Sequence, residues 1–204
     1  IRDSLYIEGV QNNGIINHYE YIINSEGTIE IRHVLKPEGK MPLWFPRIGL
    51  TLTVSDALDQ VKWYGRGPQE NYPDRKTGYP TGIYASTVQA MYEPYLMPQD
   101  YGLRTDVRWL QLTTDKGIGL QFKMNEWFNF NIYPYSTDNL TKAMYTYQLQ
   151  KQKGMTLNLD YATTGVGCTA RGVFGAYKAM PQEYRRTISI KPVSYTHLRA
   201  HETT

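Results

Sequence analysis

Residues 47–54 read Arg-Ile-Gly-Leu-Thr-Leu-Thr-Val, and residues 60–65 follow as Gln-Val-Lys-Trp-Tyr-Gly. Apolar and polar side chains alternate in both stretches, as they do in a strand with one buried face. The same pattern predicts further strands at 1–8, 15–23, 28–35, 83–90, 105–114, 117–124, 127–133, 143–149, 155–161 and 184–191. No long segment has the 3.6-residue period of a helix. The sequence therefore predicts an all-β, antiparallel fold.

Glycine and proline mark the segments between the expected strands. Residues 36–46 hold three prolines and one glycine, which predicts a loop. Residues 65–82 are rich in Gly, Pro, Asn and Asp, and a loop of that length in a compact domain is more often functional than purely structural. One helical turn is expected at 136–141, where Ser136 or Thr137 can cap it.

The composition is that of a globular protein that can bury a core. Of the 204 residues, 41% are hydrophobic and 20% are charged, which fits one large β domain, expected over residues 1–193. The chain carries 18 Tyr and 4 Trp. Such rings suit strands and sugar-contacting surfaces, and they also suit the core of a sandwich.

Charge, hydropathy and cysteine usage narrow the function classes. The formal net charge is +3, and the basic residues are scattered rather than interleaved with aromatics, so we expect no nucleic-acid partner. No apolar stretch approaches the roughly 20 residues of a membrane helix, so we expect no membrane partner. The single cysteine, Cys168, excludes an internal disulfide and the usual cysteine zinc sites. The cellular compartment stays open, since one cysteine does not distinguish a reducing compartment from an oxidising one.

Both ends of the chain carry an expectation of their own. Residues 1–8 already have a strand pattern and no initiator methionine precedes them, which indicates a piece of a longer protein. Residues 194–204 have no strand periodicity and resemble translated adapter sequence. We expect that tail to be non-native and poorly ordered.

One motif gives the chain a resemblance. Residues 65–75 read Gly-Arg-Gly-Pro-Gln-Glu-Asn-Tyr-Pro-Asp-Arg after a strand carrying Trp63, and ordered blocks follow at 91–95, 98–104, 105–109, 128–136 and 157–167. Over residues 41–192 the chain resembles the C-terminal domain of the lactose-cleaving β-galactosidases of glycoside hydrolase family 2. The resemblance implies a large twisted antiparallel β-sandwich, the supersandwich also seen in galactose mutarotases.

The resemblance also implies where the chemistry lies. Retaining glycosidases use two carboxylates about 5–5.5 Å apart, and in this family both belong to an upstream (β/α)₈ barrel that the present chain lacks. We therefore expect no catalytic residue here and no hydrolysis by this chain alone. The implied partners are that barrel in the same polypeptide, a galactoside substrate and further copies of the full enzyme. The family's magnesium and sodium sites lie in other domains, so no cofactor or metal is expected in this segment.

Several polar residues are candidates for the domain interface or for the loop scaffold. Asn71, Asp74 and Arg75 can hydrogen-bond across their loop or to the barrel, with direct sugar contact as the alternative. Arg104, Asp106 and Arg108 alternate along a strand, which places them on one face, either solvated or at an interface. Other acidic residues near the motifs, Glu70, Glu93 and Asp100 among them, are expected to be solvated or paired with arginine.

The chain departs from the family after Gly165-Val166-Gly167. There the lactose-cleaving enzymes carry a further glycine and then a Ser-Trp pair, whose indole stacks on the sugar. Here Cys168 follows, and no Trp occurs beyond Trp127. Arg171 and Phe174 are the candidate substrate-binding residues in its place, with ordinary loop packing as the alternative.

Two other functions compete with the hydrolase domain. A stand-alone carbohydrate-binding module would expose aromatic rings clustered on one face. A mutarotase-like enzyme would need a general acid and base, usually a histidine with a carboxylate. His18 and His33 lie on the opening hairpin outside the motifs, and the spacing of His197 and His201 lacks a third metal ligand nearby. Fold kinship alone does not transfer activity.

Overall fold

The computed structural model describes residues 1–9, 12–168 and 172–194. Within them lie the strands β1 (Arg2–Glu8), β2 (Asn13–Ile23), β3 (Ile29–Gly39), β4 (Arg47–Val54), β5 (Gln60–Arg66), β6 (Thr81–Thr87), β7 (Arg104–Thr113), β8 (Gly119–Tyr133), β9 (Met155–Thr163) and β10 (Tyr184–Val193). The helical segments are α1 (Thr137–Lys142) and two 3₁₀ turns, η1 (Thr146–Gln148) and η2 (Gly175–Tyr177).

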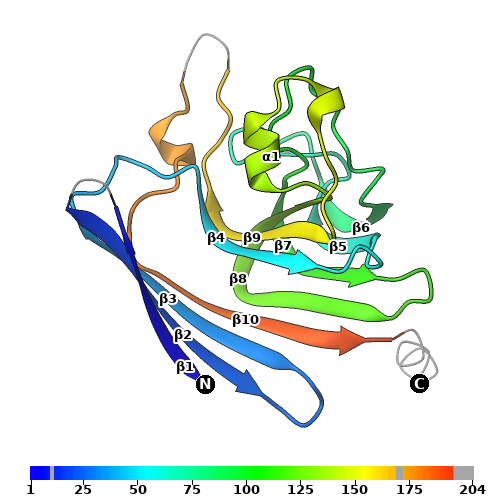
Figure 1. The fold of residues 1–204 in the computed structure, drawn as a ribbon, viewed down its shortest axis with the longest axis horizontal. Coiled ribbons are helices and arrows are strands. Elements are labelled where there is room, and N and C mark those ends of the chain that lie inside the picture. Colours follow the sequence, from blue (N-terminus) through cyan, green and yellow to red (C-terminus); the bar gives the residue numbers. More distant parts are fainter. Residues whose placement is uncertain (10–11, 169–171, 195–204) are drawn as a thin grey trace.

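Antiparallel pairing joins these strands into two layers. The hydrogen-bonded order is β1-β2-β3-β10-β8-β7-β5-β6, and β9 pairs with both β4 and β8. In Figure 1, β1, β2, β3 and β10 form the lower layer, while β4, β9, β7, β5 and β6 lie above it. This arrangement confirms the all-β antiparallel sandwich that residue alternation predicts.

The long strand β8 connects the two layers. Its residues 119–124 pair with β10, its residues 129–133 pair with β9, and β7 runs along its opposite edge. The strands β10 and β9 therefore pair with the same edge of β8, β10 near its start and β9 near its end. The two layers of the sandwich diverge between these two pairings.

The two largest of three buried apolar clusters pack the strands together. The larger one is built around Trp63, Leu110, Phe122, Phe130 and Leu157. The smaller one lies between the layers, with Ile31 and Ile188 contributed by the lower layer and Ile48 and Tyr161 by β4 and β9. Burial of a large apolar side chain contributes roughly 1.5–3 kcal/mol, so these clusters fix the layers against each other.

Three sequence expectations need correction. The strands expected at 117–124 and 127–133 are one strand, β8, and the loop expected from residue 36 begins later because β3 stays paired with β2 as far as Gly39. The strand expected at 143–149 is wrong. There the Gln148 Oε1 accepts the backbone N–H groups of Met144 and Tyr145 at 2.7 and 3.1 Å, which closes a local turn instead of a ladder.

The expected helical turn is confirmed. It runs over α1, and the Ser136 Oγ accepts the Asn139 N–H at 3.1 Å as an N-cap. The tail at 195–204 lies outside the described residues. No helix in the described part of the chain is long and apolar enough to cross a membrane.

Candidate functional site at the loop end of the sandwich

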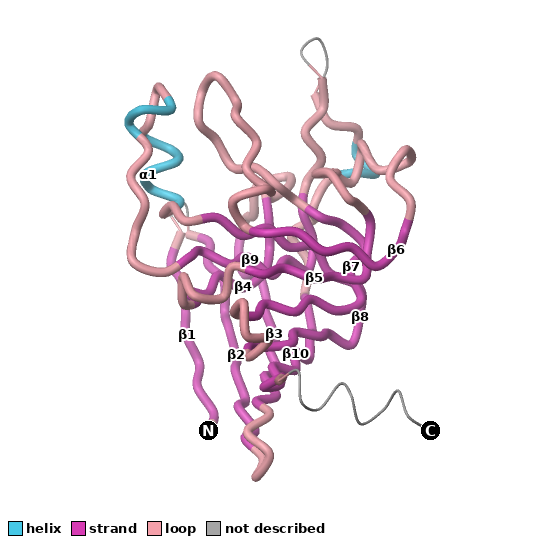
Figure 2. The backbone as a smooth tube through the Cα atoms, turned by 90° about the vertical axis from the view of Figure 1, so that its right-hand side faces the viewer, coloured by secondary structure: helices cyan, strands magenta, loops and turns pink. Residues whose placement is uncertain are grey.

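The long loops and α1 gather at one end of the molecule, above the upper-layer strands, which run across beneath them (Figure 2). We call this region the loop end. Its described segments are 40–46, 67–80, 88–103, 134–154, 164–168 and 172–183. The motifs that carry the family resemblance fall largely in these segments, so the site is built from them.

Glu70 organises the loop at 66–75. Its buried carboxylate accepts hydrogen bonds from the Tyr72 hydroxyl at 3.2 Å, the Arg75 Nη2 at 2.8 Å and the Gly102 N–H at 2.9 Å, and also from the Tyr95 hydroxyl. Burial opposes its ionisation, yet these hydrogen bonds, led by that of Tyr95, lower the pKa of Glu70. The carboxylate therefore links two loops as a fixed anion.

Asn71 continues this framework. Its Oδ1 accepts hydrogen bonds from the Thr105 N–H at 3.0 Å and from the Thr105 hydroxyl at 2.5 Å. The backbone N–H of Asn71 donates to the Leu103 carbonyl at 2.8 Å. The Asn71 side chain is fully buried. Among the expected roles of Asn71, this geometry supports a scaffold.

Asp74 connects the 66–80 loop to the segment after β9. Its carboxylate accepts the backbone N–H groups of Val166 at 3.1 Å and Gly167 at 2.7 Å. A Cβ at Gly165 would lie 2.3 Å from the Asp74 Cγ, so the close approach requires glycine there. Asp74 thus holds the backbone of the segment after β9 at Val166 and Gly167.

Simple alternation predicted that Arg104, Asp106 and Arg108 lie on one face of β7, and this prediction is wrong. The register of β7 shifts on both sides of Val107, and Asp106 adopts a positive φ of 55°. As a result Arg104 packs over buried Trp63, while Arg108 packs over Tyr64, the next residue of β5. A bulge has turned the two guanidinium groups to opposite sides.

Each of the three has definite partners. Arg104 Nε and Nη1 donate to the carbonyls of Pro68 and Gly102 at 2.9 and 2.8 Å, and burial lowers the pKa of Arg104 to about 10. The Asp106 carboxylate pairs with Arg66 at 2.6 Å and Lys76 at 2.9 Å. Burial opposes its ionisation, but these two cations lower the pKa of Asp106. The Arg108 guanidinium lies 3.9 Å from the Trp127 ring centre.

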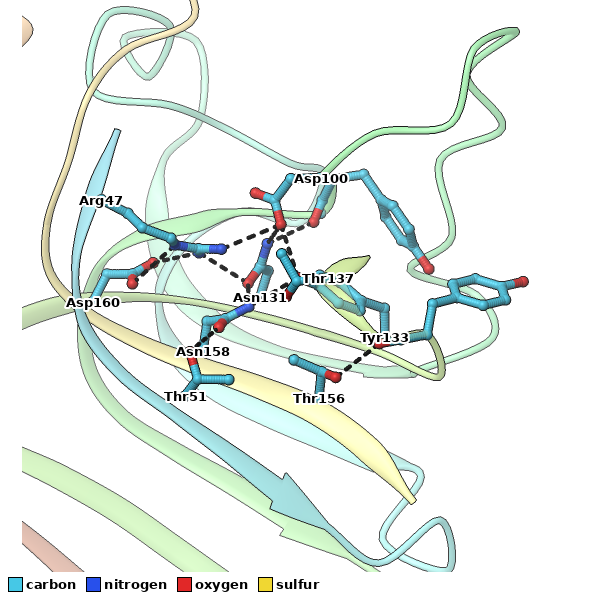
Figure 3. A network of polar contacts seen from close by, with 12 residues as sticks. Arg47, Thr51, Asp100, Asn131, Tyr133, Thr137, Thr156, Asn158 and Asp160 are labelled. Atoms are coloured by element: carbon cyan, nitrogen blue, oxygen red, sulfur yellow. Dashed lines mark hydrogen bonds and ion pairs between the residues drawn. The ribbon is translucent and has the colours of Figure 1, made fainter. Parts of the chain in front are cut away.

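Arg47 forms the centre of a second polar network, which sequence reasoning missed (Figure 3). Its Nε and Nη2 donate to the two oxygens of Asp160 at 3.1 and 2.6 Å, and its Nη1 donates to the Asp100 Oδ1 at 3.2 Å. The Arg47 Nη2 also donates to the Asn131 Oδ1 at 3.1 Å, and the Asn158 Nδ2 donates to the same oxygen at 2.9 Å. Burial raises the pKa of Asp160 to about 6, against the opposing effect of Arg47. The two-point contact with the Arg47 guanidinium favours the ionised form of this carboxylate.

A cleft of about 570 Å³ opens between the two networks. We call it the loop-end cleft. Its lining takes residues from both networks, among them Arg47, Asp100, Thr163, Tyr72, Arg75 and Tyr95. Its size lies within the range of small-molecule sites. The residues are drawn from five segments of the chain, so folding creates a site that no continuous motif displays.

The other candidate residues stand apart from these networks. Phe174 precedes η2 and is 67% exposed, and Arg171 lies outside the described residues. His33 is buried, where it hydrogen-bonds to Tyr161 and Asn17, and His18 bonds to Ser4 on the exposed edge. In the described ranges, no group of three or more His, Cys, Asp or Glu side chains is arranged so that it could hold a metal ion.

The chain is similar to bacterial β-galactosidases. It is 36% identical over 162 residues to one from Priestia megaterium, covering 79% of this chain and 16% of that protein. It is 39% identical over 122 residues to one from Vibrio cholerae, covering 60% and 11%. A third, from Pseudoalteromonas haloplanktis, is 33% identical over 159 residues, covering 76% and 14%. The chain thus spans between 11% and 16% of the length of these relatives.

Two further comparisons concern the fold and the family. A solved structure of an aldose epimerase homologue from C. elegans aligns with a TM-score of 0.46 at 10% identity, over 94% of this chain and 68% of that one. A sequence profile of the family described as beta galactosidase small chain matches residues 6–195, which is most of the chain. The chain belongs to the β-galactosidase small chain family.

Proposed function

We propose that this chain is the C-terminal domain of a family 2 retaining β-galactosidase, which hydrolyses terminal β-D-galactosides. In this proposal the domain packs against a (β/α)₈ barrel of the same polypeptide and forms one wall of its substrate pocket. The family match and the much greater length of the β-galactosidase relatives support the proposal.

The observation that carries it is the distribution of exposed apolar side chains. Of the 21 large hydrophobic residues exposed in the described part of the chain, eleven lie on the loop-end segments: Leu43, Trp44, Leu96, Met97, Met144, Tyr145, Tyr147, Val166, Phe174, Tyr177 and Met180. Six of the other ten are Ile1 and residues of β1 and β2. Apolar side chains concentrated on one part of a surface mark an interaction site. The loop end is therefore the face that we assign to the barrel.

The carboxylates at the loop end support an accessory role. Asp100 and Asp160 both pair with the guanidinium of Arg47. The guanidinium therefore fills the space between the two carboxylates, where a glycosidase would have to bind the scissile bond of its substrate. Glu70 is saturated by four donors. We infer that the proton donor and the nucleophile come from another part of the longer polypeptide.

The competing functions find less support. His33, which a mutarotase-like reaction would need as a free acid or base, is buried against Tyr161 and Asn17, and its pKa is lowered to about 4 by burial. A stand-alone binding module is less supported because the chain spans only 11% to 16% of the length of its β-galactosidase relatives.

Hydrolysis of p-nitrophenyl β-D-galactoside tests the proposal. The intact polypeptide that carries this chain should hydrolyse it, with retention of the anomeric configuration seen by NMR of the first-formed sugar. The purified 204-residue chain should not, although circular dichroism shows it folded. Hydrolysis by the chain alone, or undiminished activity of the intact polypeptide after residues 1–193 are deleted, would refute the proposal.

A further inference from the structure

Strand β1 is a regular, open edge of the sheet. It ends the hydrogen-bonded order of strands and, among the described strands, pairs only with β2. All seven of its residues are exposed, and Figure 2 shows the strand at one side of the molecule, below the loop end. Its pairing with β2 has no register shift, and its sequence contains no proline. An edge strand without a bulge or a proline is open to pairing with a further strand.

The hydrogen bonds to β2 determine which backbone groups of β1 point to the open side. The Ile1 nitrogen donates to the Tyr21 carbonyl at 3.0 Å, and the Ile1 carbonyl accepts from the Tyr21 N–H at 2.7 Å. Past the other end of β1, the Gly9 N–H donates to the Asn13 carbonyl at 2.7 Å. Such bonds alternate along an antiparallel pair, so the odd-numbered residues of β1 bond to β2. The N–H and C=O groups of residues 2, 4, 6 and 8 therefore point away from β2.

Ser4 has a local substitute for a strand partner on this open side. Its N–H donates to the carboxylate of the adjacent residue, Asp3, at 2.7 Å. A side chain of this kind satisfies a backbone donor that no strand uses. A second strand on this side would replace the contact and return the Asp3 carboxylate to solvent.

Two copies of β1 have one antiparallel register that uses every outward group. When the Leu5 residues of the two copies lie opposite each other on a twofold axis, residues 2, 4, 6 and 8 lie opposite residues 8, 6, 4 and 2. All four then form hydrogen-bonded pairs. A shift by two residues in either direction leaves only three such pairs, because β1 is centred on Leu5. The same surface thus serves both copies, as a twofold contact requires.

The side chains are complementary in this register. Arg2 of each copy lies opposite Glu8 of the other, and opposite charges across an antiparallel pair stabilise it. The Arg2 side chain is 86% exposed, although its Nε donates to Glu20 of its own chain at 2.9 Å. At the centre, the 51% exposed Leu5 side chains of the two copies lie opposite each other. Two ion pairs and an apolar contact therefore favour the register that also forms the most backbone hydrogen bonds.

We propose that β1 is an interaction surface for a second copy of this chain, with the two β1 strands paired antiparallel about Leu5. The pairing extends the lower layer of one copy into that of the other by strand addition. It uses no loop-end residue, so it goes beyond the proposed function and leaves the face that we assign to the barrel accessible.

Disulfide crosslinking tests the register in a 204-residue chain whose exposed thiol is removed by Cys168→Ser. Leu5→Cys places two thiols across the axis, where the Cα atoms lie about 4.5 Å apart, within disulfide range. We expect a covalent dimer after oxidation with copper phenanthroline. Ile7→Cys is the matched control, because Ile7 is 52% exposed on the same face of β1. The two Ile7 positions lie about 14 Å apart along the strands, so this variant should stay monomeric on a denaturing gel.

Charge reversal tests the contact between Arg2 and Glu8 by sedimentation velocity. The wild-type chain should form a reversible dimer whose fraction rises with protein concentration. Arg2→Glu and Glu8→Arg should each weaken the dimer about tenfold, because like charges then face each other twice. An equimolar mixture of the two variants should recover wild-type affinity as a heterodimer, since both contacts again join opposite charges. Lys62→Glu, at an exposed position of β5, is the control and should dimerise like the wild type.

The mixture also separates pairing from an effect within one chain. Repulsion between the new carboxylate of Arg2→Glu and Glu20 would persist in the heterodimer, so recovery is expected only if the contact joins two copies. A wild-type chain that stays monomeric, equal dimerisation of all charge variants, or no recovery in the mixture would overturn the proposal. Equal crosslinking of Leu5→Cys and Ile7→Cys would do the same, because it is the result for parallel strands.

The intact polypeptide decides between a second copy and another occupant of this edge. Leu5→Cys should crosslink two intact polypeptides, with the linked peptide identified by mass spectrometry. Crosslinking of the 204-residue chain alone would assign the edge to another segment of the longer polypeptide and overturn the proposal. Hydrolysis of the galactoside is measured separately, so the β1 contact and the proposed function can fail independently.

Discussion

Arg47 and Asp160, which are 113 residues apart in the sequence, form a two-point ion pair with its shorter contact at 2.6 Å. The Asp160 side chain is 3% exposed, so its charge is compensated almost entirely by Arg47. Substitution of Arg47→Met leaves that carboxylate buried and unpaired. We expect a loss of about 3–5 kcal/mol in the free energy of unfolding at pH 7.5, measured with urea.

The pH dependence of this variant is a second readout of the same pair. Without Arg47, burial alone raises the pKa of Asp160 above about 6, so the folded state takes up a proton that the unfolded state releases. The deficit relative to wild type should therefore shrink as the pH falls from 7.5 to 5. A deficit that stays constant over this range would show that the lost stability comes from packing and not from the charge.

His33 should make the fold sensitive to mild acid. Burial lowers its pKa from 6.5 to about 4, so between these values the unfolded chain binds a proton that the folded chain does not. Stability is therefore lost as the pH falls from 6.5 toward 4, by about 3 kcal/mol at most. His33→Gln should flatten this part of the stability profile, and a profile that keeps its slope in this variant would contradict the role assigned to His33.

Asp74 should stabilise the segment after β9. Asp74→Ala removes the acceptor of two backbone N–H groups, and we expect a loss of about 1–2 kcal/mol together with faster proteolytic cleavage between residues 164 and 178. Asp138→Ala is the matched control and should change stability by less than about 0.5 kcal/mol. Equal cleavage rates in the two variants would contradict the role assigned to Asp74.

Arg104 should not tolerate lysine. Its planar guanidinium stacks on Trp63 and donates to two carbonyls at once, which an ammonium cannot do in one position. We expect Arg104→Lys to cost about 2 kcal/mol in thermal or urea unfolding. Arg185→Lys, at an exposed arginine, controls for the exchange itself and should cost less than about 0.5 kcal/mol.

Phe174 is the described residue that we propose as a substrate contact. In the intact polypeptide, Phe174→Ala should raise KM for p-nitrophenyl β-D-galactoside several-fold and leave the unfolding midpoint unchanged, because the ring is exposed in this chain. Ile118→Ala removes a comparably exposed side chain (59%) from the turn between β7 and β8, outside the loop-end segments, and should leave KM unchanged. Equal KM values in the two variants would assign Phe174 to ordinary loop packing.

Residue alternation predicted the fold class correctly. It predicted strand bounds and side-chain faces wrongly where a polar pair or a bulge lies inside a strand. Asn125 and Glu126 interrupt the apolar pattern of β8, yet the Asn125 Oδ1 accepts the Thr187 N–H at 2.9 Å and Glu126 pairs with Arg186. The polar break is thus a contact to β10 and not a turn. At Asp106 the failure is the reverse, since a bulge interrupts an alternating sequence.

The site could be predicted only where residues that act together are close in the sequence. The Gly65–Arg75 motif identified Asn71, Asp74 and Arg75, and all three make loop-ordering contacts. Arg47 stands at the start of an ordinary strand, and its partners lie on β8, β9 and the 88–103 loop. The one available signal was a set of polar residues at strand positions otherwise occupied by apolar ones, namely Asn131, Asn158 and Asp160.

The position of β10 also determines when the sheet can form completely during synthesis. Strands β1 to β3 reach the rest of the sheet only through β10, which is the last of the ten to leave the ribosome. Until then the first three strands can form only a meander with an unpaired edge on β3, a surface prone to association with other chains. Nascent chains that stall before residue 184 should accordingly depend on chaperones, whereas chains released after residue 193 can close the sheet unaided.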